Sequence, residues 1–244
     1  MLKKEDIHLL ILYLLAMRQL FFLAFFLTSL TAFSQNSFSK EISLLTDNDL
    51  FTSTYRDRYY SNGLFLTYRY IHKDNKKENI EKIISSFQLG HMIFTPVKAT
   101  LEFAAQHDRP FAGYLFGEYG KSIFYKNQNI LTTKLQLGVI GQSAQGEGLQ
   151  NFIHGMYNFP DATGWKHQIK DALAINFELN YSKHFSKMSF DRFDLSSYSI
   201  LRAGTIFTDI STGIYSRFGL RKLQKLHNST AFNSNLNTKN GKSY

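Results

Sequence analysis

The sequence predicts an all-β protein, an antiparallel transmembrane β-barrel with a short helical segment in one long loop. Tyr and Phe occur 14 and 23 times among 244 residues, and both suit a pleated surface or the aromatic girdle of a membrane barrel. Apolar and polar residues alternate in segments of about ten residues, the length of a membrane-spanning strand. After Gln35 no apolar run is long enough to cross a membrane as a helix.

The first part of the chain reads as a secretory signal peptide over residues 1–34. Two apolar runs, residues 7–16 and 20–30, are separated by Arg18. The second run has a basic residue before it and small residues at positions −3 and −1 of a cleavage site. Met17 fits a true start codon. A single membrane anchor is the alternative, but each run is shorter than the roughly 20 residues that a spanning helix needs.

The clearest strand follows the long loop, over residues 173–185. Its apolar face carries Leu173, Ile175, Phe177, Leu179, Tyr181 and Phe185. Its polar face carries Asn176, Glu178, Asn180, Ser182 and His184. This pattern suits lipid outside the barrel and a wet lumen inside. A soluble β-sandwich shows the same alternation and is the alternative.

Weaker alternation predicts seven further strands. They cover residues 41–45, 63–71, 84–94, 112–125, 130–140, 198–207 and 210–220. The three prolines, Pro96, Pro110 and Pro160, fall at strand boundaries or in loops, where a missing N–H does no harm. The predicted barrel occupies residues 35–220. The polar, basic tail of residues 221–244 loses the alternation and is predicted to be disordered or the end of a truncated barrel.

One stretch, residues 141–171, interrupts the β pattern. Gln150 and His154 are four residues apart there, which places them on one face of a short helix. Long ordered loops in compact proteins tend to be functional. This loop also holds the only Trp, Trp165, and His167.

Composition excludes several classes of site. The chain has no Cys, so disulfides, thiol nucleophiles and Cys-ligated zinc are ruled out. The net charge of +9 is scattered rather than gathered in one stripe, which suits anionic lipid headgroups better than nucleic acid. The signatures G-x-S-x-G, H-E-x-x-H and the phosphate-binding loop are absent from the sequence.

A polar cluster around the first predicted strands is the candidate site. Asn48 and Asp49 precede Ser61, and His154 comes from the long loop. Taken singly, the first three read as turn or cap residues and His154 as a solvated side chain. Together, a carboxylate, an amide, a hydroxyl and an imidazole can bind a hard cation and activate water.

Several sequence blocks resemble the outer-membrane lipid A 3′-O-deacylase family. They are Asp47-Asn48-Asp49-Leu50-Phe51, Asp57-Arg58-Tyr59-Tyr60-Ser61-Asn62-Gly63-Leu64, Phe94-Thr95-Pro96, Asp108-Arg109-Pro110-Phe111-Ala112-Gly113-Tyr114, Gly141 to His154 with Gln150-x-x-x-His154, and Gly164-Trp165-x-x-Gln168. The blocks occur in the family's order and span roughly residues 42–219.

The resemblance implies a twelve-stranded barrel in the bacterial outer membrane, acting as a monomer. It would remove the 3′-linked acyloxyacyl chain from lipid A, within lipopolysaccharide and among the outer-membrane lipids, by calcium-dependent hydrolysis. In a mechanism similar to that of secreted phospholipases A2, His154 is the general base on water. Calcium near Asp49 stabilises the oxyanion, and Asn48 and Ser61 assist.

The resemblance also marks Asp108, Arg109 and Gln150 as a supporting motif. Neighbouring Asp and Arg residues, here and at Asp57-Arg58, most often form ion pairs that hold loops in place. Contact between their Arg side chains and the glucosamine phosphates of lipid A is the alternative.

The chain departs from the family after Leu220, where the closing strands of a twelve-stranded barrel are missing. Either a smaller barrel closes or the chain is a truncated version, because lipid cannot satisfy open sheet edges. Two alternatives to the enzyme therefore stay open. They are a non-catalytic, porin-like or structural barrel, and an inactive truncated homologue.

Overall fold

The computed structural model describes residues 38–52, 59–72, 78–97, 103–229 and 236. The predicted signal peptide of residues 1–34, and the pair Asp57-Arg58, lie outside the described residues. No helix within the described ranges is both long and apolar enough to cross a membrane.

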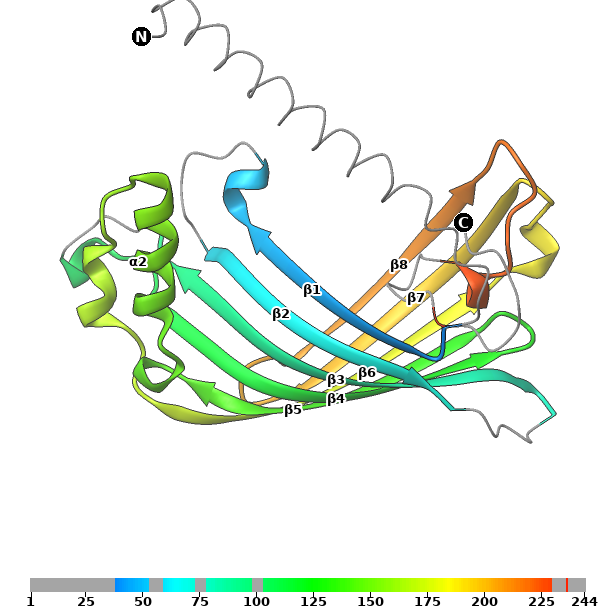
Figure 1. Cartoon of the computed structure of the whole chain (residues 1–244), viewed down its shortest axis with the longest axis horizontal. Helices are drawn as coiled ribbons and strands as arrows, with labels where there is room; N and C mark the ends of the chain where they lie inside the picture. The colour runs from blue at the N-terminus through cyan, green and yellow to red at the C-terminus, as the bar shows by residue number, and fades with distance from the viewer. Residues whose placement is uncertain (1–37, 53–58, 73–77, 98–102, 230–235, 237–244) are drawn as a thin grey trace, which may run out of the picture. The chain divides into compact units, whose positions relative to one another are not determined.

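The described chain forms eight antiparallel strands in one sheet, in sequence order, so each strand pairs with the next (Figure 1). The strands are β1 Lys40–Asn48, β2 Tyr59–Ile71, β3 Ile80–Thr95, β4 Ala112–Tyr125, β5 Ile130–Ile140, β6 Ala172–His184, β7 Phe193–Gly204 and β8 Asp209–Phe218. The helix is α2, Gly146–Tyr157, and short 3-10 turns are η1 Asp49–Thr52, η2 Ala104–Gln106, η3 Gln142–Ala144, η4 Thr163–His167, η5 Ser186–Met188 and η6 Leu226–Asn228. The eight predicted strands and the helical segment of the long loop are confirmed.

Strand boundaries differ from the prediction where polar residues continue the sheet. β1 runs past residue 45 to Asn48, and β2 begins before residue 63, because Asn48 pairs with Asn62 in the ladder. β7 ends at Gly204 rather than residue 207. Beyond Gly204 the backbone N–H groups of residues 206 and 207 donate to the side chain of Asn176 instead of to a neighbouring strand. Both bonds go to Asn176 Oδ1, at 3.0 and 3.1 Å.

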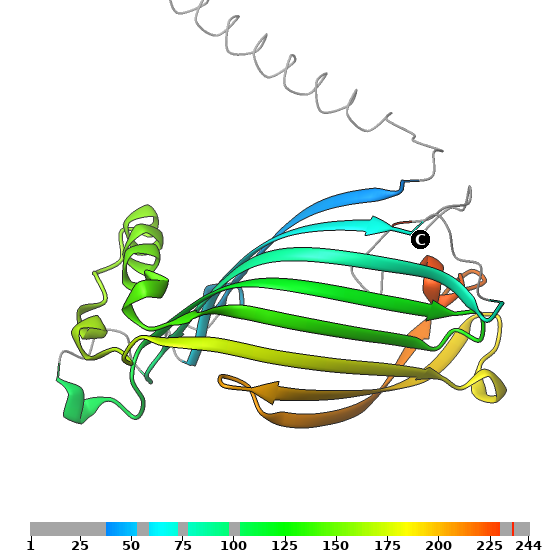
Figure 2. The same cartoon turned by 90° about the horizontal axis from the view of Figure 1, so that it is seen from below.

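The sheet is curved (Figures 1 and 2), and its concave face carries many buried polar side chains. Side chains from strands that are not neighbours meet across this face. The amide of Asn176 in β6 donates to the Tyr114 hydroxyl in β4 at 3.0 Å. The hydroxyls of Ser182 in β6 and Tyr215 in β8 are 2.7 Å apart. Buried polar residues of this face include Thr67, Glu118, Asn176, Ser182 and Ser196.

The opposite face, which we call the outward face, is apolar and exposed. In β6, Leu173 and Ile175 are 77% and 54% exposed, whereas Asn176 is 4% exposed. Other exposed apolar side chains of this face are Ile42, Leu44, Leu66, Phe87, Leu89, Leu137, Leu201, Ile210 and Ile214. A soluble β-sandwich buries its apolar faces between two sheets, so the sandwich alternative does not fit.

The two ends of the sheet are built differently. At one end, which we call the turn end, the buried Leu226 packs with Ile71, Ile84, Phe124 and Ile130 on the concave face. The segment after β8 therefore folds back over the ends of β2 and β4. The other end, which we call the rim, is where β1, β3 and β5 finish and where α2 lies (Figure 1).

Candidate functional site

The loop after β5 covers the outward face at the rim. Along β3, Phe87 and Leu89 point outward and are 51% and 57% exposed, yet Ile93, in the same alternating file, is 0% exposed. Ile93 packs against Phe111 and Trp165 in one cluster of buried residues. The outward face is therefore open in the half toward the turn end, which we call its lower half, and covered by protein at the rim.

A contact between two glycines allows α2 to lie close to the outward face of the sheet, which we also call the wall. A Cβ atom on Gly113 of β4 would lie 3.0 Å from the Cα atom of Gly146, the first residue of α2. A Cβ atom on Gly146 would lie 2.5 Å from the Trp165 ring. Any side chain at either position would push the helix away, so the approach depends on glycine at both.

His91 ties the same loop to β3. Its Nε2 atom lies 2.6 Å from the carbonyl oxygen of Ala144, and because a carbonyl only accepts, Nε2 carries the proton. The sequence prediction missed His91. The signal that could have found it is a polar residue in the outward file, between the apolar Leu89 and Ile93.

Asp171 closes the base of the loop. Its carboxylate accepts hydrogen bonds from the backbone N–H and the hydroxyl of Ser143, both at 2.8 Å. The backbone hydrogen bond, followed by the hydroxyl, holds the pKa of Asp171 below its usual value. The two ends of the 141–171 loop are thereby joined beside the rim.

Gln150 and His154 share a buried face of α2, as predicted for a short helix. The Gln150 side-chain oxygen accepts from the Trp165 indole N–H at 2.7 Å. His154 Nδ1 lies 2.7 Å from the carbonyl oxygen of Pro160. The carbonyl requires Nδ1 to carry the proton, so a neutral His154 has its basic lone pair on Nε2.

Asn48 and Asp49 lie at the rim end of β1. Asn48 is the last residue of the strand and pairs with Asn62 of β2. Asp49 begins η1, and its Oδ1 atom is buried. Beside them, the Tyr60 hydroxyl donates to Asp47 at 2.8 Å, which fixes the preceding carboxylate.

Ser61 lies at a β-bulge. The register between β2 and β3 shifts between Tyr60 and Asn62, which leaves Ser61 as the extra residue. Its hydroxyl is 2.6 Å from that of Thr95, and Ser61 is only 1% exposed. Bulges redirect side chains and are common beside active sites. Here the bulge directs Ser61 toward Thr95, in the outward file of β3.

A cavity of about 300 Å³, which we call the rim pocket, separates the ends of β1 and β2 from α2. It is lined by Thr46, Asp47, Asn48, Phe51, Asn62, Gly63, Leu64, Leu149, Phe152, Ile153, Met156 and Tyr157. Asn48 lines it directly. Asp49, Ser61 and His154 do not, but each is the chain neighbour of a lining residue. The structure thus brings β1, β2 and α2 together around one pocket.

Asp108 and Arg109 lie apart from that lining. The Asp108 carboxylate accepts the backbone N–H of Val97 at 2.8 Å and lies 3.5 Å from the Arg109 side chain. The Val97 hydrogen bond is the main cause of a lowered Asp108 pKa. Arg109 stacks over the Tyr59 ring at 3.8 Å. These contacts are those of residues that hold rim loops together.

The donor atoms near the rim pocket suit a hard cation. Among the described residues, no group of three or more His, Cys, Asp or Glu side chains forms a metal-binding cluster. Asp49 and Asn48 do supply carboxylate and amide oxygens, and Asp49 has one of its oxygens buried. Calcium takes such oxygens together with backbone carbonyls and water, so these residues fit it by donor chemistry.

Comparison with known proteins agrees with this architecture. The model of the family described as outer membrane protein LpxR matches residues 20–243. The solved structure of LpxR from Salmonella typhimurium has a TM-score of 0.54 and 21% identity, over 72% of this chain and 62% of that chain. The chain therefore spans less than two thirds of that protein, and the likeness shows the fold. No curated protein matches the chain. Since the family model covers nearly the whole sequence, the chain belongs to the LpxR family of outer membrane proteins.

Proposed function

We propose that the chain is an outer-membrane hydrolase that removes the 3′-linked acyloxyacyl chain from lipid A. The observation that carries the proposal is the position of the rim pocket. It opens between α2 and the outward, apolar face of the wall, where Asn48 and Leu64 both line it. A lipid in the membrane reaches such a pocket from the side, with its ester near the boundary between headgroup and hydrocarbon.

His154 supplies the base. The Pro160 carbonyl, 2.7 Å from Nδ1, fixes the ring and its tautomer, as a carboxylate or carbonyl does for many functional histidines. Nε2 then accepts the proton of the attacking water. General-base catalysis of this kind contributes about 10²–10⁴ in rate.

Asn48 and Ser61 stabilise the negative charge that develops on the carbonyl oxygen of the ester. An amide N–H and a hydroxyl are suitable donors for such an oxyanion. Calcium bound near Asp49 would add positive charge beside the same oxygen. The bulge and the hydrogen bond to Thr95 hold the Ser61 hydroxyl in place before the substrate arrives.

The concave face favours an enzyme over the porin-like alternative. Near the rim, Tyr114, Phe116 and Phe207 pack together on this face. At the turn end, Leu226 is fully buried in the cluster with Ile71. Side chains thus occupy both ends of the concave face, where a porin keeps a water-filled channel.

The direct test is acyl release from lipid A by the purified, folded protein, followed by mass spectrometry. We expect loss of the 3′ acyloxyacyl group, suppression by a chelator and recovery when calcium is added back. Asp49→Asn should need far more calcium, while Asp161→Asn, at an exposed loop position, should behave like the wild type. A folded protein that releases no acyl group contradicts the proposal. Activity indifferent to chelators contradicts its calcium part alone.

A further inference from the structure

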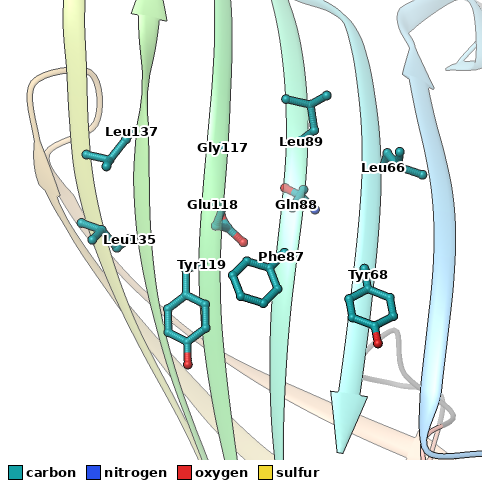
Figure 3. A pocket seen from close by; sticks show the side chains of 10 residues that line it. All are labelled: Leu66, Tyr68, Phe87, Gln88, Leu89, Gly117, Glu118, Tyr119, Leu135 and Leu137. Carbon is teal, nitrogen blue, oxygen red and sulfur yellow. The ribbon is translucent and has the colours of Figure 1, made fainter.

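A second hollow lies on the outward face, below the rim pocket. We call it the wall groove, and its volume is about 520 Å³. Its centre is Gly117 of β4, with Leu89 and Leu137 paired to it on either side (Figure 3). Below these, Phe87 and Tyr119 pack ring against ring at 5.3 Å. The missing side chain at Gly117 makes a depression in an otherwise continuous apolar surface.

The surface that the wall groove offers to a ligand is mainly hydrocarbon. Two polar residues also border it, Gln88 and Glu118, but they belong to the file that faces the concave side (Figure 3). Gln88 donates to the Thr67 hydroxyl at 2.8 Å, and Glu118 accepts from the Gln136 amide at 2.8 Å. These hydrogen bonds hold the polar ends away from the outward face. The hydroxyls of Tyr68 and Tyr119 lie at the end of the hollow away from Leu89 and Leu137 (Figure 3), so between them the hollow matches an apolar chain.

The wall groove continues from the rim pocket along β2. Leu64 lines the pocket and Leu66 lines the groove. These two residues point outward in the same file, about 7 Å apart at two residues of strand. From Leu64 to Tyr68, the last groove residue of β2, the path is about 13 Å long. A molecule with its reacting group in the pocket can lay a straight tail along this path.

We propose that the wall groove binds the acyl chain of the lipid whose ester reaches the rim pocket, so that the groove selects for chain length. This inference rests on the proposed function. The occupant follows from the continuity of the two hollows and from the orientation of the path, along strands that run from the rim toward the turn end. A chain long enough to reach Gly117 gains contact with Leu89 and Leu137. A chain that ends near Leu64 does not.

Gly117 allows a precise test. A Cβ atom added there meets nothing within 4 Å, so Gly117→Leu fills the groove without overpacking the wall, and leucine suits a strand better than glycine. The matched control is Ala203→Leu. Ala203 is exposed in β7 and pairs with the outward Phe177, so the control adds the same side chain to the same face outside the groove.

The readout is kcat/KM for lipid A substrates that differ only in the length of the released chain. We expect Gly117→Leu to lower kcat/KM for the long chain by about tenfold, because remote apolar contact contributes to transition-state binding. The short chain should keep wild-type kinetics, and Ala203→Leu should match the wild type with both substrates. An equal loss for both chain lengths, or no loss for the long chain, overturns the proposal. If phospholipids merely fill the wall groove, Gly117→Leu should leave kcat/KM for the long chain unchanged.

A binding measurement separates the groove from the chemistry. Lipid A carrying a photoreactive diazirine at the end of its acyl chain is cross-linked to the His154→Asn protein, and the labelled peptides are mapped. Label should concentrate on the β3–β5 segments around Gly117 and disperse when Gly117→Leu is added. A labelling pattern that Gly117→Leu does not change overturns the proposal that the wall groove binds the acyl chain, even if the enzyme is active. A wild type that releases no acyl chain but labels the groove overturns only the proposed function.

Discussion

The lower and upper halves of the outward wall share one alternating pattern but present different chemistry. In the lower half, Leu66 and Phe87 are apolar and exposed. At the rim, the same files carry Asn62 and His91, and protein covers them. Polar groups are costly against lipid and persist where protein or water satisfies them. The change in a file from exposed leucine to covered amide or imidazole therefore marks where the outward face passes from an open apolar surface to one covered by protein.

The covered half supplies the polar groups of the proposed site without using the concave face. The bulge at Ser61 turns a hydroxyl outward. The Gly113 and Gly146 contact brings α2 against the strands. Each feature is local and separable, so substitutions can disturb the rim while the lower half serves as a control.

The largest expected effect is that of His154→Asn. Asparagine can still donate to the Pro160 carbonyl, but it has no basic ring nitrogen, so the tether remains and the base is lost. We expect kcat for acyl release to fall by about 10²–10⁴, with unchanged heat-modifiable gel mobility. His167→Ala, at an exposed position of the same loop, is the control. Near-normal kcat in a folded His154→Asn protein would remove His154 from the mechanism.

Ser61→Ala should have the next largest effect, and its control is Ser122→Ala on the concave face of β4. Both substitutions remove one hydroxyl pair between strands, Ser61 with Thr95 at 2.6 Å and Ser122 with Thr132 at 2.9 Å. Each should cost about 1 kcal/mol of stability in urea unfolding. Only Ser61→Ala should also lower kcat, by about 10²-fold. If both variants keep full activity, the Ser61 hydroxyl is structural.

Alanine substitutions at two glycines of α2 should differ in their effect on stability and activity, with a smaller loss of activity than the changes above. At Gly146 a methyl group would collide with Trp165, whereas at Gly148 it meets nothing within 4 Å. Gly146→Ala should destabilise the docked loop by about 1–3 kcal/mol through overpacking and reduce activity about tenfold. Gly148→Ala should be neutral or stabilising by up to about 1 kcal/mol. Limited proteolysis of residues 141–171 reports the docking directly, and equal sensitivity of the two variants would show that the close approach is unimportant.

The smallest effect concerns acid pH. Because hydrogen bonds from Ser143 lower the pKa of Asp171 in the folded protein, the contribution of this carboxylate is complete above its unfolded pKa of about 3.9. That contribution is lost as the pH falls through the lower folded value. The protection of amides 141–145 against hydrogen exchange, relative to their intrinsic exchange rates at each pH, should therefore fall below about pH 4 in the wild type. Asp171→Asn should exchange faster at neutral pH and show little further change. A pH-independent wild type would contradict this role.

Strand identity was largely predictable because alternation and turn residues are local signals. The predicted bounds of β4 and β5, residues 112–125 and 130–140, coincide with the structure. The end of β1 was missed because Asn48 is a poor strand residue by itself and stays in the ladder only through its partner Asn62. Pairing across strands is a tertiary property that alternation within one strand does not encode.

The candidate site was predictable only in its residue types. The resemblance proposed Asn48, Asp49, Ser61 and His154, and their roles stay predictions. No local pattern indicates that α2 covers the outward face, because that depends on Gly113 meeting Gly146 from a distant part of the chain. The bulge at Ser61 depends on register in the same way.

The proposed function requires that the covered rim of the outward face performs lipid A deacylation with His154 as the base. The most direct measurement is mass spectrometry of lipid A from cells that produce the wild-type chain or His154→Asn, with both proteins shown to be folded in the outer membrane. We expect lipid A without its 3′ acyloxyacyl chain in the wild type and intact lipid A with His154→Asn. Identical lipid A from the two strains would contradict it.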